Sequence, residues 1–122
     1  MKNWINWFEI PVSDFSRAQN FYCGIFGIEM HVMEMMGMQM GIFPTEDNGS
    51  GGAIVKGDDY TAAMNGTLIY LNGGHDLNNV LNKIEAHGGK VFMPKTIIGE
   101  DMGYFAIFAD TEGNKLALHS MK

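Results

Sequence analysis

The stretch FEIPVSDFSRAQNFYCGIFG, residues 8–27, decides the fold of this 122-residue chain. Its beginning belongs to an aromatic and β-branched run over residues 4–12, which is typical of a β-strand. Asp14 can then cap a helix, and apolar residues recur at three- and four-residue intervals over residues 18–26. Gly27 follows at the point where a helix often ends in a residue with positive φ. The stretch therefore predicts a strand followed directly by an amphipathic helix.

The chain comes back into register when it is shifted by 62 positions against itself, about half its length. The matching pairs are Phe8 with Tyr70, Asp14 with Asp76, Phe15 with Leu77, Gly27 with Gly89, residues 40–43 with 102–105, and Gly51 with Gly113. Glycines, acids and apolar residues that recur at one offset indicate a repeated supersecondary unit. We therefore expect two copies of one small sheet with its helix, and a cleft between the two halves.

The remaining elements follow from turn residues and apolar runs. In the first copy, strands are expected at residues 28–36, 38–43 and 52–55. In the second copy we expect a strand at 67–71, a helix at 76–87, and strands at 90–93, 104–109 and 115–119. The predicted fold class is α+β, with a single domain made of two βαβββ modules, residues 1–60 and 61–122, connected through residues 57–66.

Composition narrows the class of protein. The formal net charge is −6 with eight Lys and Arg, which argues against nucleic acid as a partner because phosphate binding needs a basic surface. Apolar runs are strand-sized, far from the ~20 residues of a spanning helix, so no membrane partner is expected. The chain has one cysteine and does not open with a secretory signal pattern, so we expect a cytoplasmic protein.

Two stretches of the chain resemble one known family. Residues 8–22, followed by Phe26 and Gly27, are similar to the opening of vicinal oxygen chelate proteins, which include glyoxalase I, extradiol dioxygenases and bleomycin-resistance proteins. FADTEGNKLALH at residues 108–119 is similar to the last turn and strand of that family. The resemblance implies paired modules whose mixed sheets curl around a cavity. It also implies a homodimer, in which sheet edges would be buried.

The resemblance further implies where a metal would be held, on the first and last strands of each module. Those positions fall on Trp7, on Leu68 or Ile69, on Val55 and on Ala117. A divalent cation needs oxygen, nitrogen or sulfur donors, which these side chains do not supply. We therefore expect no metal and no other cofactor. This counts against glyoxalase I and extradiol dioxygenase activity.

Two polar residues make a shifted site conceivable. Strand side chains alternate between faces, so Glu9 shares a face with Trp7, and His119 shares one with Ala117. Glu9 is a candidate general base or hydrogen-bond acceptor, and His119 a candidate proton donor. Alternatively, Glu9 bonds backbone groups or a tyrosine hydroxyl, and His119 is solvated. A third hypothesis makes the two residues ligands of a shifted metal, although two ligands form a poor site.

Aromatic side chains are candidates for the wall of the cavity. We assign ligand-binding roles to Trp7, Phe43, Tyr70 and Phe105, of which Phe43 and Phe105 are repeat partners. Lys95, together with the glycine-bounded loop 99–103, is a candidate for closing over the cavity mouth. Eleven methionines, six of them within residues 30–40, either line an adaptable pocket or fill a core.

The expected function is binding of a small organic molecule, with a lyase- or isomerase-type proton transfer by Glu9 and His119. One alternative is a binding protein that sequesters its ligand without chemistry. Another is an interaction domain whose cavity is filled by Trp7 and methionines.

Overall fold

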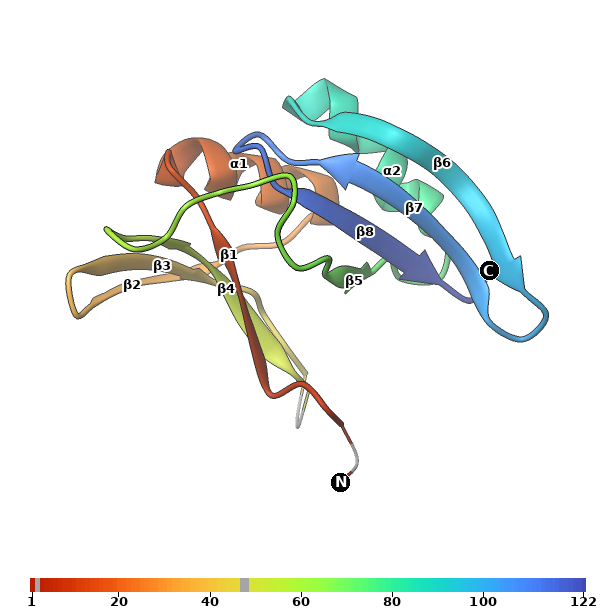
Figure 1. Ribbon diagram of the computed structural model, residues 1–122, viewed down its shortest axis with the longest axis horizontal. Coiled ribbons are helices and arrows are strands. Elements are labelled where there is room, and N and C mark those ends of the chain that lie inside the picture. The colour runs from red at the N-terminus through yellow and green to blue at the C-terminus, as the bar shows by residue number, and fades with distance from the viewer. Residues whose placement is uncertain (2, 47–48) are drawn as a thin grey trace.

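The structure, a computed structural model, describes residues 1, 3–46 and 49–122 (Figure 1). Its first half contains β1 (Trp7–Pro11), α1 (Phe15–Phe26), β2 (His31–Met35), β3 (Met38–Ile42) and β4 (Gly51–Lys56). Its second half contains β5 (Tyr70–Asn72), α2 (Asn78–Ile84), a 3₁₀ turn (Glu85–His87), β6 (Lys90–Gly99), β7 (Gly103–Ala109) and β8 (Lys115–Ser120). The predicted α+β fold with two βαβββ units is confirmed.

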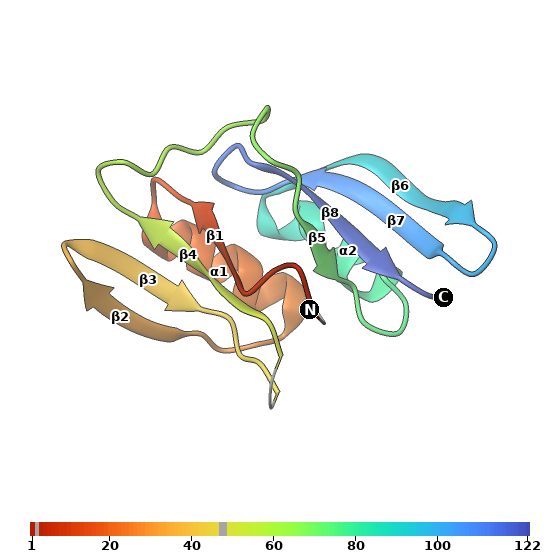
Figure 2. The ribbon, with the colours of Figure 1, turned by 60° about the horizontal axis from the view of Figure 1, so that its bottom comes forward.

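Each half forms a four-stranded mixed sheet. The strand orders are β1-β4-β3-β2 and β5-β8-β7-β6, so the two sheets have the same topology. In both, the first strand runs parallel to the last, and the remaining pairs are antiparallel. Strands β1 and β5 lie at the inner edges of the sheets, and β2 and β6 at the outer edges (Figure 2).

The two halves share one core. Helices α1 and α2 contact each other, and the largest cluster of buried residues combines both helices with one face of each sheet. The members with no exposed surface include Tyr22, Ile25 and Ile54 from the first half and Leu77, Phe108 and Leu118 from the second. Among the residues that the structure describes, no helix covers the opposite face of either sheet. We call these the first outer face and the second outer face.

Several elements differ in extent from the sequence prediction. Strand β6 continues through Pro94 to Gly99, whereas the sequence predicts its end at Met93. Proline is tolerated because β6 is an edge strand and its pairing with β7 is irregular between Met93 and Thr96. The second helix is shorter than predicted, since its last turn is 3₁₀ and ends at Gly88 with φ 98°.

The repeat register also differs along the chain. Gly27 and Gly88, which end the two helices, lie 61 positions apart. Ile54 and Leu118, which occupy the same place in the last strands, lie 64 positions apart. The second copy is longer between its helix and its last strand. The structural partner of Ala117 is therefore Ala53, and the uniform offset of 62 is only an average.

A carboxylate of the second half fixes the start of α1. The Glu112 side chain has no exposed surface, and its Oε1 accepts from the backbone N–H groups of Ser13 at 3.0 Å and Asp14 at 2.8 Å. Its Oε2 accepts from Arg17 Nε at 2.7 Å. Burial opposes ionisation, but the hydrogen bonds from Arg17, Asp14, Thr111 and Ser13 outweigh it and lower the pKa of Glu112 to about 2.

Candidate functional site

Glu9 lies on the first outer face and is held by two donors. Its Oε1 accepts from the Tyr60 hydroxyl at 2.5 Å, and its Oε2 accepts from Trp7 Nε1 at 3.2 Å. The hydrogen bond to Glu9 is the main cause that raises the pKa of Tyr60, followed by burial. Trp7 and Tyr60 therefore fix the position of the Glu9 carboxylate. The alternative in which Glu9 bonds a tyrosine hydroxyl agrees with the structure, and that tyrosine is Tyr60.

Tyr60 also covers the middle of the first outer face. Its ring packs against a small cluster formed by Met40, Ala53 and Val55, together with partly buried neighbours. The residue belongs to the segment that connects the two halves, where sequence periodicity gives no signal. The sequence therefore does not single out Tyr60.

His119 lies on the second outer face. Its Nε2 is 2.8 Å from the Met102 carbonyl oxygen, which can only accept, so Nε2 carries the proton and Nδ1 keeps a lone pair in the neutral ring. Its neighbours across the sheet are Phe105 on β7 and Asn72 on β5. His119 can therefore accept a proton at Nδ1 while its ring orientation is fixed.

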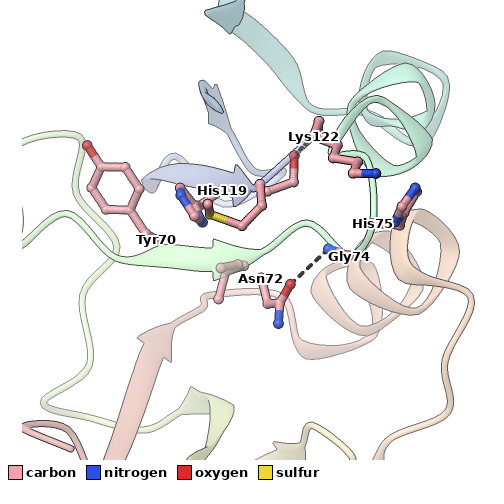
Figure 3. A pocket seen from close by; sticks show the side chains of 9 residues that line it. Tyr70, Asn72, Gly74, His75, His119 and Lys122 are labelled. Atoms are coloured by element: carbon pink, nitrogen blue, oxygen red, sulfur yellow. Dashed lines mark hydrogen bonds between the residues drawn. The ribbon is translucent and has the colours of Figure 1, made fainter. Parts of the chain in front are cut away.

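A surface pocket of about 630 Å³ adjoins His119. Tyr70 and Asn72 from β5 and His119 from β8 line it, and His75 and Lys122 lie farther along (Figure 3). Its lining combines polar side chains, among them Asn72 and His75, with apolar surface from residues such as Tyr70 and Met121.

A larger cavity than this pocket, about 870 Å³, lies between the two halves, next to the inner strands β1 and β5. We call it the interrepeat cavity. Its wall is formed mainly by apolar side chains, including Phe8, Phe26, Phe43, Leu68, Ile69 and Tyr70. Gly52 lets the Phe8 ring lie against the backbone of β4, because a Cβ at that position would clash with the ring. The sequence predicts a cleft between the halves with Phe43 and Tyr70 in its wall, but its patterns single out neither Phe8 nor Phe26 for that role.

The structure brings together only some of the predicted site residues. Trp7 contacts Glu9, Phe105 is paired with His119, and Phe43 and Tyr70 share the interrepeat cavity. Glu9 and His119 belong to different sheets.

Lys95 lies on neither outer face but on the helix side of the second sheet. Its Nζ lies 3.0 Å from Asp76 Oδ1 and 4.6 Å from the centre of the Tyr104 ring. Tyr104 packs against the core that contains both helices, so Lys95 lies on the helix side of its sheet.

The positions at which the family resemblance implies a metal do not fit one. Trp7 lies on the first outer face and Ala117 on the second. In the register of the structure, the repeat partner of Trp7 is Leu68, and the repeat partner of Ala117 is Ala53. None of these four side chains offers a ligand to a divalent cation. Within residues 1, 3–46 and 49–122, no three His, Cys, Asp or Glu side chains are grouped closely enough to hold a metal.

None of the described helices has the length and apolar character needed to cross a membrane.

Comparison with known proteins assigns the family. Residues 4–118 match the family model described as the Glyoxalase/Bleomycin resistance protein/Dioxygenase superfamily. A glyoxylase-like domain-containing protein from Didymella fabae is 29% identical over 124 residues, which cover 93% of this chain and 91% of that protein.

Solved structures agree in fold. A member of the same superfamily from Sphaerobacter thermophilus superposes with a TM-score of 0.69 at 17% identity over 97% of each chain. TnmS3, an antibiotic binding protein from Streptomyces sp. CB03234, superposes with a TM-score of 0.63 at 20% identity over 98% of each chain. Because the family model spans nearly the whole chain and the repeated topology agrees with it, this chain belongs to the glyoxalase/bleomycin resistance protein/dioxygenase superfamily.

Proposed function

We propose that the protein binds a small, largely apolar organic molecule in the interrepeat cavity and sequesters it. The observation that carries this proposal is the cavity itself, at about 870 Å³ with a mainly apolar and aromatic wall. Ligand sites in proteins commonly have volumes of about 300–1,000 Å³ and walls of this kind. Tyr70, Ser50 and Thr45 add a few hydroxyl groups that would orient a ligand.

Sequestration is favoured over proton transfer within one chain. Glu9 and His119 lie in different sheets, and neither lines the interrepeat cavity. Both oxygens of Glu9 already accept hydrogen bonds from Trp7 and Tyr60. A general base must reach the proton that it removes, and this geometry does not bring the two residues to one ligand. Binding by a superfamily relative is consistent with this proposal, since TnmS3 is described as an antibiotic binding protein.

The test is to fill the cavity. Leu68 lines the cavity, so Leu68→Trp should lower the affinity for an apolar fluorescent dye, 8-anilinonaphthalene-1-sulfonate, by about tenfold or more. The matched control is Ile97→Trp, because Ile97 is 62% exposed on β6 and does not line the cavity. Equal loss of dye binding in both variants, or no loss in Leu68→Trp with the fold intact by circular dichroism, would overturn the proposal.

A second candidate function is proton transfer in a homodimer. No helix of the described part of the chain covers either outer face, and both faces carry exposed aromatic side chains, with Trp7 45% and Tyr70 52% exposed. If the first outer face of one protomer covers the second outer face of another, Glu9 would approach His119 of the partner subunit. Such an arrangement would supply a carboxylate and an imidazole to one site.

Cross-linking tests this arrangement without a substrate. In a Cys23→Ala background, a chain carrying Glu9→Cys mixed with a chain carrying His119→Cys should form an interchain disulfide under mild oxidation. The control pairs Glu9→Cys with Lys95→Cys, which lies on the helix side of the second sheet. Sedimentation that shows only monomer at high concentration, or equal cross-linking in the control, would contradict the dimeric site.

A further inference from the structure

Four methionines form a block on the first outer face. Strands β2 and β3 pair Met33 with Met40 and Met35 with Met38. Opposite residues of an antiparallel pair project to the same face, and residues two apart in a strand do so as well. Met33, Met38 and Met40 indeed pack in one cluster. We call these four residues the methionine block.

The register of the hairpin fixes this arrangement. Met36 and Gly37 form its two-residue turn with φ values of 54° and 76°, the conformation that suits a tight hairpin. A slip of one residue would move the methionines to the other face of the sheet. Opposite side chains in such a hairpin have Cβ atoms about 4.5–5.5 Å apart, and diagonal ones about 7–8 Å. Methionine has three rotatable side-chain bonds, so four sulfur atoms can converge between these positions.

Packing alone does not demand sulfur at these positions. In the second sheet, the last strands relate Met40 to Phe105, so the corresponding pairs of β6 with β7 are Thr96 opposite Phe105 and Gly99 opposite Gly103. The same scaffold is therefore built there without methionine at these positions. The block is also accessible from solvent at one end, because Met35 is 43% exposed, whereas Met40 is 6% exposed at the other.

We propose that the methionine block binds one soft monovalent cation, Cu(I) or Ag(I), through its thioether sulfurs. Thioethers are soft, neutral ligands that select Cu(I) over hard divalent cations. They need not lose a proton to bind, so metal binding here is a simple association with no redox step. His31 is the next residue on this face of β2 and would add an imidazole at the end of the block. The site is separate from the interrepeat cavity and does not depend on the proposed function.

The probe is Ag(I), which is stable in air, added to protein with ¹³C-labelled methionine methyl groups in a buffer without chloride. We expect one equivalent to shift the methyl signals of Met33, Met35, Met38 and Met40. Met64 and Met121, which are 41% and 58% exposed elsewhere, should not shift. The measurement is made in the wild type and in Cys23→Ala, because a thiol would compete for silver.

A double substitution, Met33→Leu with Met40→Leu, should weaken Ag(I) binding by about tenfold or more while it preserves apolar packing. The matched control is Met64→Leu with Met121→Leu, which should leave the affinity unchanged. The proposal is overturned if all methionine signals shift alike, if none of the four responds, or if the first double variant binds as tightly as the wild type. Because the methyl shifts are measured in the wild type, a variant that fails to fold would not remove the test.

Discussion

The two repeats share a scaffold but differ in how their helices begin. In the first, Asp14 accepts from the Arg17 N–H at 3.1 Å, and Glu112 of the other repeat binds the same helix end. In the second, the N-cap of α2 is Leu77, whose N–H donates to the Ser120 hydroxyl at 3.0 Å. An enclosed carboxylate therefore joins the second repeat to the first helix, whereas the second helix is fixed from within its own repeat.

The largest expected effect comes from Glu112→Gln. The neutral amide cannot replace the charge that Arg17 and the N–H groups of the helix start require, so one buried acceptor site is lost. We expect the free energy of unfolding to fall by about 2–3 kcal/mol, measured by urea denaturation. Glu100→Gln is the control, since Glu100 is exposed in the turn before β7. Similar losses in both variants would show that the carboxylate does not join the repeats.

Glu112→Gln should also change how the free energy of unfolding depends on pH. The pKa of Glu112 is lowered from its ordinary value of 4.5 to about 2 in the folded protein. Its contribution to stability is therefore complete above the unfolded pKa and is lost as the pH falls from 4.5 toward 2. Urea denaturation at a series of pH values should show the wild type and Glu112→Gln converging over that range. A difference that stays constant down to the lowest pH would refute the assigned pKa.

A smaller effect separates Asp14 from Asp76, which the repeat places at equivalent points of the sequence. Asp14→Ala removes the N-cap of α1 and should lower the free energy of unfolding by about 1 kcal/mol. Asp76 accepts from the Asn78 N–H and from Lys95, which lower its pKa, but the residue is partly exposed. We expect Asp76→Ala to have the smaller effect in urea denaturation, because water replaces its partners. The reverse order would contradict the asymmetry between the two helix ends.

The sequence predicts the local features of this fold well. The order of strands and helices follows from apolar periodicity and from glycines such as Gly27 and Gly88, which are signals contained in a few neighbouring residues. Irregular pairing is not contained in such local signals, so the sequence predicts the end of this strand at Met93, whereas β6 continues along β7 to Gly99. The uniform offset also hides the extra length of the second copy, which changes the partner of Ala117 from Val55 to Ala53.

The candidate site could be predicted only in part. Alternation along β1 correctly groups Glu9 with Trp7, because a strand has a fixed period of two. The donor from Tyr60 reaches Glu9 across 51 positions of sequence, from a segment without periodicity. Glu112 reaches Asp14 across 98 positions. Contacts of this kind depend on how the two halves pack, which single-residue patterns do not encode.

The smallest expected effect concerns the two outer faces. On the first, Tyr60 donates a hydrogen bond to Glu9, whereas on the second His119 bonds to the Met102 carbonyl oxygen. The hydrogen bond to Glu9 is the main cause that raises the pKa of Tyr60 above 10.0, because it stabilises the protonated hydroxyl beside a carboxylate. Glu9→Gln should therefore lower the pKa of Tyr60 toward 10.0, measured by tyrosinate absorbance with Tyr60→Phe used to assign the signal. Glu34→Gln, on the opposite face of the same sheet, should leave that pKa unchanged. If Glu9→Gln also leaves it unchanged, the carboxylate is not held by Tyr60 in solution and is free to act on a ligand, which would strengthen the case for proton transfer at the first outer face.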